Sequence, residues 1–236
     1  MRLYIIRHAD PDYSIDSLTP AGHLEAAALA DRMAVLGLDE IYTSPLGRAR
    51  ATAKYTADLL GMEPVVLEWT RELHKWHVDV PELHGPVTCV WDAHAHHIRQ
   101  LEPPMSTSNW HEYTPFDNPA FKEGYEKIRK ESDAWLETLG YRRLNGSYQV
   151  VQGNRKKIAV FCHGGFGLTW LAHLLEIPLP LMWGGFFLYP SSVTTVLFDE
   201  RPAGYATPRC VGLADVSHLY AKGLSPQPSG IKANCD

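Results

Sequence analysis

The chain has 236 residues, of which 45% are hydrophobic, and its formal net charge is −5. This length and apolar content suit one α/β domain with an insertion. The negative charge argues against a nucleic-acid surface, because such surfaces are rich in Lys and Arg. The four cysteines form no C-x-x-C pair, which argues against a zinc knuckle and a disulfide framework. Cys162 lies in an apolar run and is predicted to be a reduced core residue.

Two apolar stretches bear on location. Leu3–Ile6 is too short for a signal peptide. The longest apolar region, Ile177–Pro190, is interrupted by prolines and glycines and cannot form a membrane span of about 20 residues. We therefore expect a cytoplasmic protein that does not bind membranes.

The first third of the chain alternates short strands with helices. Leu3–Ile6 is predicted to be a strand buried on both faces. Thr19 and Pro20 then suit the N-cap and first position of a helix that ends at Gly37. Residues 41–43, 48–60 and 65–67 follow as a strand, a helix and a strand. This alternation predicts a mostly parallel sheet between two layers of helices.

The pattern stops between about residues 73 and 118, where the chain is rich in His, Trp and Pro. We predict an irregular cap here, inserted over one edge of the sheet in a single domain that spans residues 1–236. The insertion aromatics are expected mainly to pack, with one or two lining a substrate entrance; they are Trp76, Trp91, Trp110, Tyr113 and Phe116.

Regular structure returns after the cap. Asn118 and Pro119 start a predicted helix that runs to about Leu139, and Ile158–Cys162 is a clear buried strand. A helix over 166–175 and a closing pair of strands over 193–198 and 209–213 follow, with Gly204 in the turn between the strands. The tail from Gly223 is predicted to be loose.

Charged and imidazole side chains follow three of the predicted strands. Arg7 and His8 follow the first, Arg48 the second, and His163 the strand that ends at Cys162. Because ligands bind beyond the carboxyl ends of parallel strands, these four side chains can meet in one pocket. Guanidinium groups and a glycine-flanked helix start favour a phosphate there.

Histidine also gives such a pocket a chemical role. A neutral imidazole nitrogen is a nucleophile near pH 7, and neighbouring arginines disfavour its protonated form. The same arginines stabilise the charge of a phosphoryl group in transfer. A carboxylic acid is then needed to protonate the leaving oxygen and to activate water afterwards.

The motifs resemble those of the histidine phosphatase superfamily, also called the phosphoglycerate mutase-like family. The resemblance covers roughly residues 1–72 and 155–215. It is strong because several motifs occur in the order that the family has. The matching segments are Arg7-His8-Ala9-Asp10, Leu18–Gly22, Thr43–Ala53 and Phe161–Gly165.

The resemblance implies a role for each matching residue. His8 corresponds to the nucleophile, while Arg7, Arg48 and His163 correspond to residues that hold the phosphoryl group. Glu72 stands where the family has its acid. The sequence departs from the family where Ala9 replaces glycine, where Ser14 replaces an asparagine common in mutases, and where His74, Trp76 and His77 follow Glu72. Ser14, His74 and Trp76 are candidate substrate contacts.

The leading function is therefore metal-independent hydrolysis of a small phosphate monoester through a phosphohistidine on His8. A phosphoglycerate-type mutase with the same pocket and a non-enzymatic phospho-ligand binder are the alternatives. No cofactor is predicted. The histidines of His94–His97 could bind a metal, but an exposed or substrate-facing role is favoured. The sequence does not predict an oligomeric state.

Overall fold

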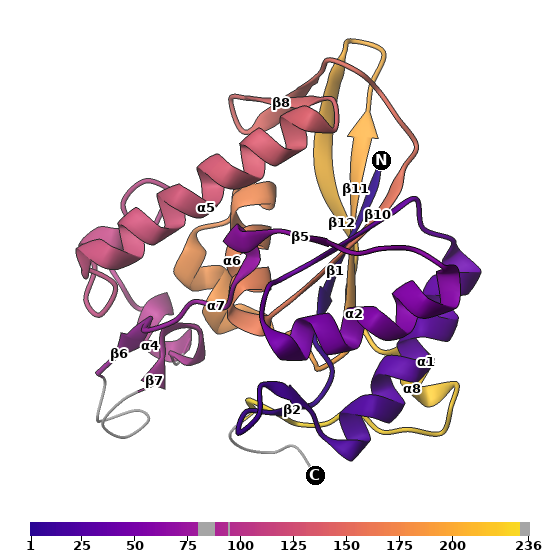
Figure 1. Ribbon diagram of the computed structural model, residues 1–236. Helices are drawn as coiled ribbons and strands as arrows, with labels where there is room; N and C mark the ends of the chain where they lie inside the picture. The colour runs from indigo at the N-terminus through magenta and orange to yellow at the C-terminus, as the bar shows by residue number, and fades with distance from the viewer. Residues whose placement is uncertain (80–87, 94, 232–236) are drawn as a thin grey trace.

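The structure is a computed structural model that describes residues 1–79, 88–93 and 95–231, without the side chain of His97. An eight-stranded sheet runs through it (Figure 1). In order across the sheet, the strands are β5 (Val65–Val66), β4 (Glu40–Thr43), β10 (Lys157–Cys162), β1 (Arg2–Arg7), β11 (Val193–Glu200), β12 (Tyr205–Asp215), β9 (Ser147–Val150) and β8 (Tyr141–Leu144).

The two halves of this sheet differ in direction. The strands β5, β4, β10 and β1 run parallel, whereas the pairs from β1 to β8 are antiparallel. Strands β1 and β10 lie side by side in the middle and are buried over nearly their whole length. Their register pairs Arg7 with Cys162, so both strands end at the same edge of the sheet.

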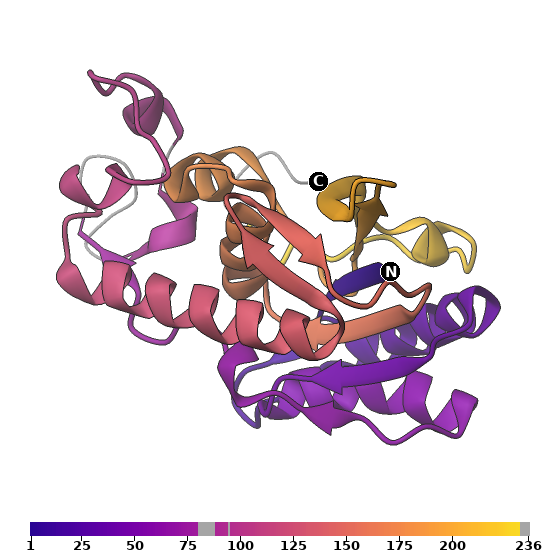
Figure 2. The same ribbon diagram turned by 90° about the horizontal axis from the view of Figure 1, so that it is seen from above.

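Helices cover both faces of the sheet, which confirms the three-layer α/β prediction (Figures 1 and 2). Alternate residues of β1 point to opposite faces: Leu3 and Ile5 belong to one core, and Tyr4 and Ile6 to the other. The first core packs under α5 (Pro119–Thr138), α6 (Gly164–Leu175) and α7 (Leu179–Gly185). The second packs under α1 (Pro20–Leu36) and α2 (Gly47–Leu60), and α8 (Ser217–Tyr220) contacts α1.

The helix starts follow the predicted caps. The Thr19 side chain accepts a hydrogen bond from the Gly22 N–H, and the Asn118 side chain accepts one from the Ala120 N–H. Both helices have proline next to the cap, where the missing N–H costs nothing. No helix in the described part of the chain combines the length and the apolar character needed to cross a membrane.

The described parts of the cap are short elements beside α7 and α5. A small hairpin of β6 (His77–Val78) and β7 (Thr88–Cys89) leads into the 3-10 turn η2 (Val90–Asp92), α4 (Ala95–Arg99) and a second turn, η3 (Trp110–Glu112). The elements η2 and α4 contact α7, and η3 contacts α5. Most cap aromatics pack as predicted, since Trp76 and Trp110 surround Trp183 of α7. The 3-10 turn η1 (Glu68–Thr70) and the ladder of β2 (Pro11–Asp12) with β3 (Ser17–Leu18) complete the described elements.

The hairpin of β8 and β9 and the helix α7 are among the elements that the sequence analysis did not predict. The strands β8 and β9 form a hairpin whose turn is Asn145-Gly146, with φ of 47° and 77°. An Asn-Gly turn with positive φ is a strong hairpin signal, but the strand before it contains two adjacent arginines, which interrupt the apolar alternation. The helix α7 lies in the segment that contains Pro178, Pro180 and two glycines, where prolines at the helix start are compatible with its geometry.

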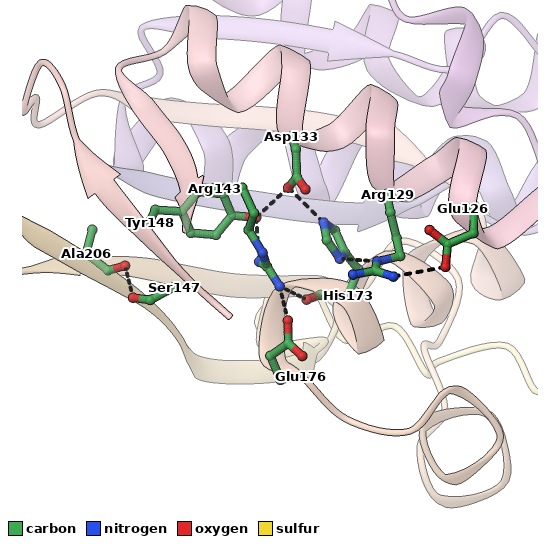
Figure 3. Close-up of polar contacts among 9 residues, drawn as sticks. All are labelled: Glu126, Arg129, Asp133, Arg143, Ser147, Tyr148, His173, Glu176 and Ala206. Atoms are coloured by element: carbon green, nitrogen blue, oxygen red, sulfur yellow. Dashed lines mark hydrogen bonds and ion pairs between the residues drawn. The ribbon is translucent and has the colours of Figure 1, made fainter. Parts of the chain in front are cut away.

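A polar network joins α5, α6 and the β8–β9 hairpin (Figure 3). His173 of α6 is almost fully buried; its Nε2 lies 2.8 Å from Asp133 Oδ1, and its Nδ1 lies 3.3 Å from Arg129 Nε. Because Arg129 can only donate, His173 carries its proton on Nε2 and donates it to Asp133. The same Asp133 oxygen accepts from Tyr148 Oη at 3.0 Å, and Arg143 donates to Tyr148 Oη at 2.9 Å. Burial lowers the pKa of His173, against the opposing effect of Asp133.

We expect His173→Gln to lower the free energy of unfolding at pH 7 by about 1–3 kcal/mol, because buried hydrogen bonds lose their geometry. Since folding lowers the pKa of His173, its neutral ring contributes stability above pH 6.5, and this contribution is lost as pH falls toward the folded pKa. The difference between wild type and variant should therefore shrink from pH 7 to pH 5. Urea denaturation measures both.

The matched control is Glu126→Gln. Glu126 forms an exposed ion pair with Arg129 at i,i+3, so its loss should change stability by no more than about 0.5 kcal/mol. A constant difference between wild type and His173→Gln across this pH range would contradict the pKa direction given for His173.

Candidate functional site

The structure brings Arg7, His8, Arg48 and His163 together at the carboxyl ends of β1, β4 and β10. The rings of His8 and His163 meet edge to face, with centroids 5.2 Å apart. Arg48, in the first turn of α2, places its Nε 3.2 Å from His8 Nε2. The Arg7 guanidinium lies beside Gly164, where an added Cβ would come within 3.4 Å of Arg7 Nε. The result is a buried, positively charged pocket made from distant segments of the chain.

The ring of His8 is held in one tautomer. Its Nδ1 lies 2.8 Å from the Ala9 carbonyl oxygen, which can only accept, so the proton sits on Nδ1. The Nε2 lone pair is then directed toward the Arg48 side of the pocket. Burial, followed by the charge of Arg7, holds the pKa of His8 well below 6.5. The ring is therefore neutral at pH 7, with a nucleophilic nitrogen facing the arginines.

Asp16 fixes the position of Arg48, a contact that the sequence reasoning missed. Its Oδ1 accepts from Arg48 Nη1 at 2.6 Å, and its Oδ2 accepts from the Gly47 N–H at 2.7 Å. Burial would raise the pKa of Asp16, but these hydrogen bonds and the charge of Arg48 outweigh it and lower the pKa. The other face of the pocket is closed by Tyr13, whose ring centroid lies 5.4 Å from Arg48 Cζ.

His163 is fully buried and is anchored by Ser44, another residue without an assigned role in the sequence analysis. Its Nε2 lies 2.8 Å from Ser44 Oγ. Its Nδ1 is buried without a hydrogen-bond partner among the described residues. Burial and the neighbouring His8 and Arg48 hold the pKa of His163 well below 6.5. A ring with one anchored nitrogen and one unused nitrogen is suited to contact an anion's oxygen.

Glu72 lies at the N-terminus of α6. Its Oε1 accepts from the backbone N–H groups of Leu73 at 3.0 Å and Phe166 at 2.8 Å, and its Oε2 accepts from that of Gly165 at 3.2 Å. Burial raises the pKa of Glu72, although these N–H groups and Arg7 oppose the change. A carboxyl group that is held in place and protonated more readily than usual can act as a general acid.

A glycine allows Glu72 and the cap to meet. A Cβ on Gly165 would lie 2.6 Å from the Trp91 ring and 2.9 Å from Glu72 Oε1, so only glycine fits there. Trp91 of η2 thus lies against the start of α6, beside the carboxyl group. This is the cap aromatic that reaches the site, as one or two were expected to do.

A cavity of about 150 Å³ opens onto Arg7, His8 and Glu72, whereas Arg48 and His163 are not among its lining residues. Larger hollows exist, including one of about 790 Å³ along α2, but neither His8, His163 nor Glu72 lines that one. The cap and the segment before β11 form the walls of the smaller cavity. Its lining residues are Arg7, His8, Tyr13, Glu72, Cys89, Trp91, Asp92, Gly164, Gly165, Leu168, Phe186, Phe187, Leu188 and Gly230.

The three candidate substrate contacts do not line this cavity. Ser14 is exposed, and its N–H and hydroxyl both bond to Asp12. The side chain of His74 is also exposed, whereas Trp76 is buried against Phe121 and Trp183. Being close in sequence to the motifs does not place these residues in the pocket. For His74 and Trp76 the reason is that the chain turns into the cap after Glu72.

The possible metal site at His94–His97 lies partly outside the described residues, which exclude His94 and the side chain of His97. Within the described part, no three His, Cys, Asp or Glu side chains gather in a way that could hold an ion.

Ser229 and Gly230 of the C-terminal tail contact the pocket, so this part of the tail is not loose as predicted, while residues 232–236 lie outside the described part of the chain. Arg7 donates from Nη1 to the Leu188 carbonyl at 2.6 Å and from Nη2 to the Ser229 carbonyl at 3.0 Å. The Ser229 hydroxyl bonds to the Asp10 carboxylate, and Gly230 lines the cavity. The contact with Arg7 uses a backbone carbonyl, which leaves no signal in the side-chain pattern.

We expect Asp16→Asn to weaken the binding of inorganic phosphate roughly tenfold, or about 1.4 kcal/mol, because Arg48 loses its charged partner. Isothermal titration measures the dissociation constant. The control is Asp12→Asn, a carboxylate of the same loop that bonds to Ser14 and not to Arg48. Unchanged affinity in Asp16→Asn would mean that α2 alone positions Arg48.

Comparison with known proteins agrees with this geometry. The putative phosphoserine phosphatase 2 of Hydrogenobacter thermophilus is 41% identical over 192 residues, covering 73% of this chain and 84% of that protein. The probable phosphoglycerate mutase GpmB of Serratia proteamaculans is 31% identical over 83 residues, covering 31% of this chain and 39% of that one.

Solved structures share the fold. A phosphoserine phosphatase of Entamoeba histolytica, in complex with 3-phosphoglyceric acid, has a TM-score of 0.61 at 21% identity and covers 92% of this chain and 98% of its own. A mycobacterial glucosyl-3-phosphoglycerate phosphatase has a TM-score of 0.57 at 19% identity and covers 90% and 98%. The sequence profile of the histidine phosphatase superfamily (branch 1) matches residues 3–206. With its ordered motifs and its paired histidines at the sheet edge, the chain belongs to the histidine phosphatase superfamily.

Proposed function

We propose that the protein is a phosphatase that hydrolyses a small phosphate monoester through a phosphohistidine on His8, without a metal ion. The observation that carries the proposal is the neutral His8 ring, whose unprotonated Nε2 accepts a hydrogen bond from Arg48 Nε at 3.2 Å. Around that nitrogen, Arg7 and His163 complete the pocket for the phosphoryl oxygens, and Glu72 supplies the carboxyl group. The positive charge that a metal would provide comes here from guanidinium groups.

The first step transfers the phosphoryl group. His8 Nε2 attacks phosphorus and forms the P–N bond while the P–O bond to the leaving alcohol breaks. The leaving oxygen keeps the electron pair and takes a proton from Glu72. Arg7 and Arg48 balance the charge on the transferring oxygens throughout.

The second step restores the enzyme. Glu72, now a carboxylate, accepts a proton from water as the water oxygen attacks phosphorus and the P–N bond breaks. Inorganic phosphate leaves, the electron pair returns to His8 Nε2, and Glu72 is protonated again. One carboxyl group therefore serves as acid and then as base.

The relatives support this proposal. Similarity to a protein named phosphoserine phosphatase extends over 73% of the chain, whereas similarity to a named phosphoglycerate mutase extends over 31%. The mutase remains the second candidate, because it would use the same pocket but return the phosphoryl group to a sugar acid. Ser14 stands in place of the asparagine common in mutases, which favours hydrolysis.

His8→Ala should lower kcat with 4-nitrophenyl phosphate by about 10³-fold or more, because the nucleophile is lost. Wild-type enzyme quenched without acid should carry an acid-labile, alkali-stable phosphoramidate from labelled substrate, and the variant should carry none. His23→Ala is the control, since His23 lies on the surface of α1 beside Tyr55. Isomerisation of 3-phosphoglycerate much faster than any phosphate release would favour the mutase.

Glu72→Gln should separate substrates by their leaving groups. Alkyl phosphates, whose alkoxide needs a proton, should be hydrolysed about 10²–10⁴-fold more slowly. Activated aryl phosphates should lose much less, because their leaving group departs unprotonated. The measurement is kcat/KM for one substrate of each class. Equal losses on both would assign Glu72 a positioning role instead.

A further inference from the structure

The backbone peptide group between Ala9 and Asp10 makes a hydrogen bond at each end. Its carbonyl oxygen, from Ala9, accepts from His8 Nδ1 at 2.8 Å. Its N–H, from Asp10, donates to Glu25 Oε2 at 2.9 Å. One peptide group thus connects the His8 ring to a carboxyl group on α1 that does not line the cavity.

Other contacts also hold this peptide group. The Ala9 N–H donates to Thr52 Oγ1 at 3.0 Å, and the Asp10 carboxylate accepts from Thr19 Oγ1 at 2.7 Å. A neutral amide oxygen could accept from the Asp10 N–H in place of Glu25. What a carboxyl group adds at this position is a negative charge that it can gain or lose.

Glu25 is unusually buried for a carboxyl group. It is 2% exposed, and its second oxygen, Oε1, makes no hydrogen bond of normal geometry among the described residues. Burying a carboxylate with an unsatisfied oxygen costs more free energy than burying a neutral amide. A carboxyl group placed in this way behind a reactive residue is a candidate for a role in the reaction.

The surroundings of Glu25 bring its ionisation close to neutral pH. Burial raises the pKa of Glu25 to about 7, and the charge of Asp10 acts in the same direction. The Asp10 N–H, the Ser191 hydroxyl and the charge of Arg7 oppose the rise. His218 of α8 contacts Ser191, but burial lowers its pKa to about 4, so its ring is neutral near pH 7. Other ionisable groups of α1 and α2 have polar partners of their own: Arg48 with Asp16, Tyr55 with His23, Arg32 with Asp215 and Lys54 with Asp58.

A negative charge on Glu25 acts on His8 through the peptide group. A carboxylate that accepts from a peptide N–H polarises that group, so the carbonyl oxygen at its other end becomes a stronger acceptor. A stronger acceptor for the Nδ1 proton holds the His8 ring more firmly and raises the electron density on Nε2. Nε2 is the nitrogen that attacks phosphorus in the proposed reaction.

We propose that Glu25 is a positioning residue for the nucleophile, and that in its ionised form it strengthens, through this peptide group, the hydrogen bond that holds His8 Nδ1. The expected effect on rate rests on the proposed phosphatase function. The coupling between Glu25 and His8 does not, because it can be measured without turnover.

The kinetic test uses Glu25→Gln, which keeps an acceptor for the Asp10 N–H but cannot carry a charge. The measurement is kcat/KM with 4-nitrophenyl phosphate, as the ratio of wild type to variant, so that the ionisation of the substrate and of other groups cancels. The ratio should be near one at acidic pH, where Glu25 is protonated, and should rise to about 3- to 10-fold at alkaline pH. The midpoint should lie near pH 7. Asp31→Asn is the control, since Asp31 lies on the same helix and pairs with Lys222, and its ratio should not change with pH.

The spectroscopic test follows the Nδ1 proton of His8 by NMR in histidine-labelled protein, with His8→Ala to identify the signal. A stronger hydrogen bond moves this proton downfield. The signal should move downfield in wild type as the pH rises through about 7, and it should stay in place in Glu25→Gln.

The two readouts separate the possible failures. A rate ratio that is the same at every pH would give Glu25 a purely structural role, and it would overturn the inference while the phosphatase function stands. A His8 signal that moves equally in wild type and Glu25→Gln would overturn it as well. If no phosphate monoester is turned over, the proposed function fails, and the NMR signal alone decides whether Glu25 acts on His8.

Discussion

The parallel pairing of β1 with β10 decides where the reactive groups lie. Its register sets Arg7 opposite Cys162, and the His8 N–H donates to the Cys162 carbonyl at 2.9 Å. The residue that follows each strand is a histidine, His8 after β1 and His163 after β10. The pairing of the two strands therefore brings the two imidazoles together at the sheet edge. A register shift of one residue would turn one of the two rings to the other face of the sheet. Because both strands are buried on both faces, their apolar side chains hold this register.

Burial then sets the protonation states. Burial holds the pKa of both histidines well below 6.5, so their rings are neutral, and it makes the Glu72 carboxyl group hold a proton more readily than usual. The opposite roles proposed for His8 and Glu72, nucleophile and acid, would therefore arise from one physical cause. The positive charge of the arginines lowers the pKa of both histidines further. On Glu72, the charge of Arg7 opposes the increase in pKa that burial causes.

The sequence predicted what depends on local pattern. The caps at Thr19 and Asn118 and the alternation of strands and helices follow from short-range rules. The convergence of four polar residues follows from the rule that ligands bind beyond the carboxyl ends of parallel strands. The hairpin at Asn145 was missed because two adjacent arginines interrupt the apolar alternation of β8. Asp16, Ser44 and Ser229 were missed for a different reason. Their contacts join segments that only the tertiary fold brings together, and that of Ser229 uses a carbonyl oxygen common to every residue type.

The contact between Arg7 and the Ser229 carbonyl has a consequence for how the sequence of the tail can change during evolution. The family profile ends at residue 206, yet Ser229 and Gly230 help to close the pocket around Arg7. A backbone carbonyl makes the contact, so side chains of the tail can change without removing it. The tail can therefore vary among descendants of this chain while the motif residues stay constant. New substrate preferences could arise there by drift in a segment that carries none of the chemistry.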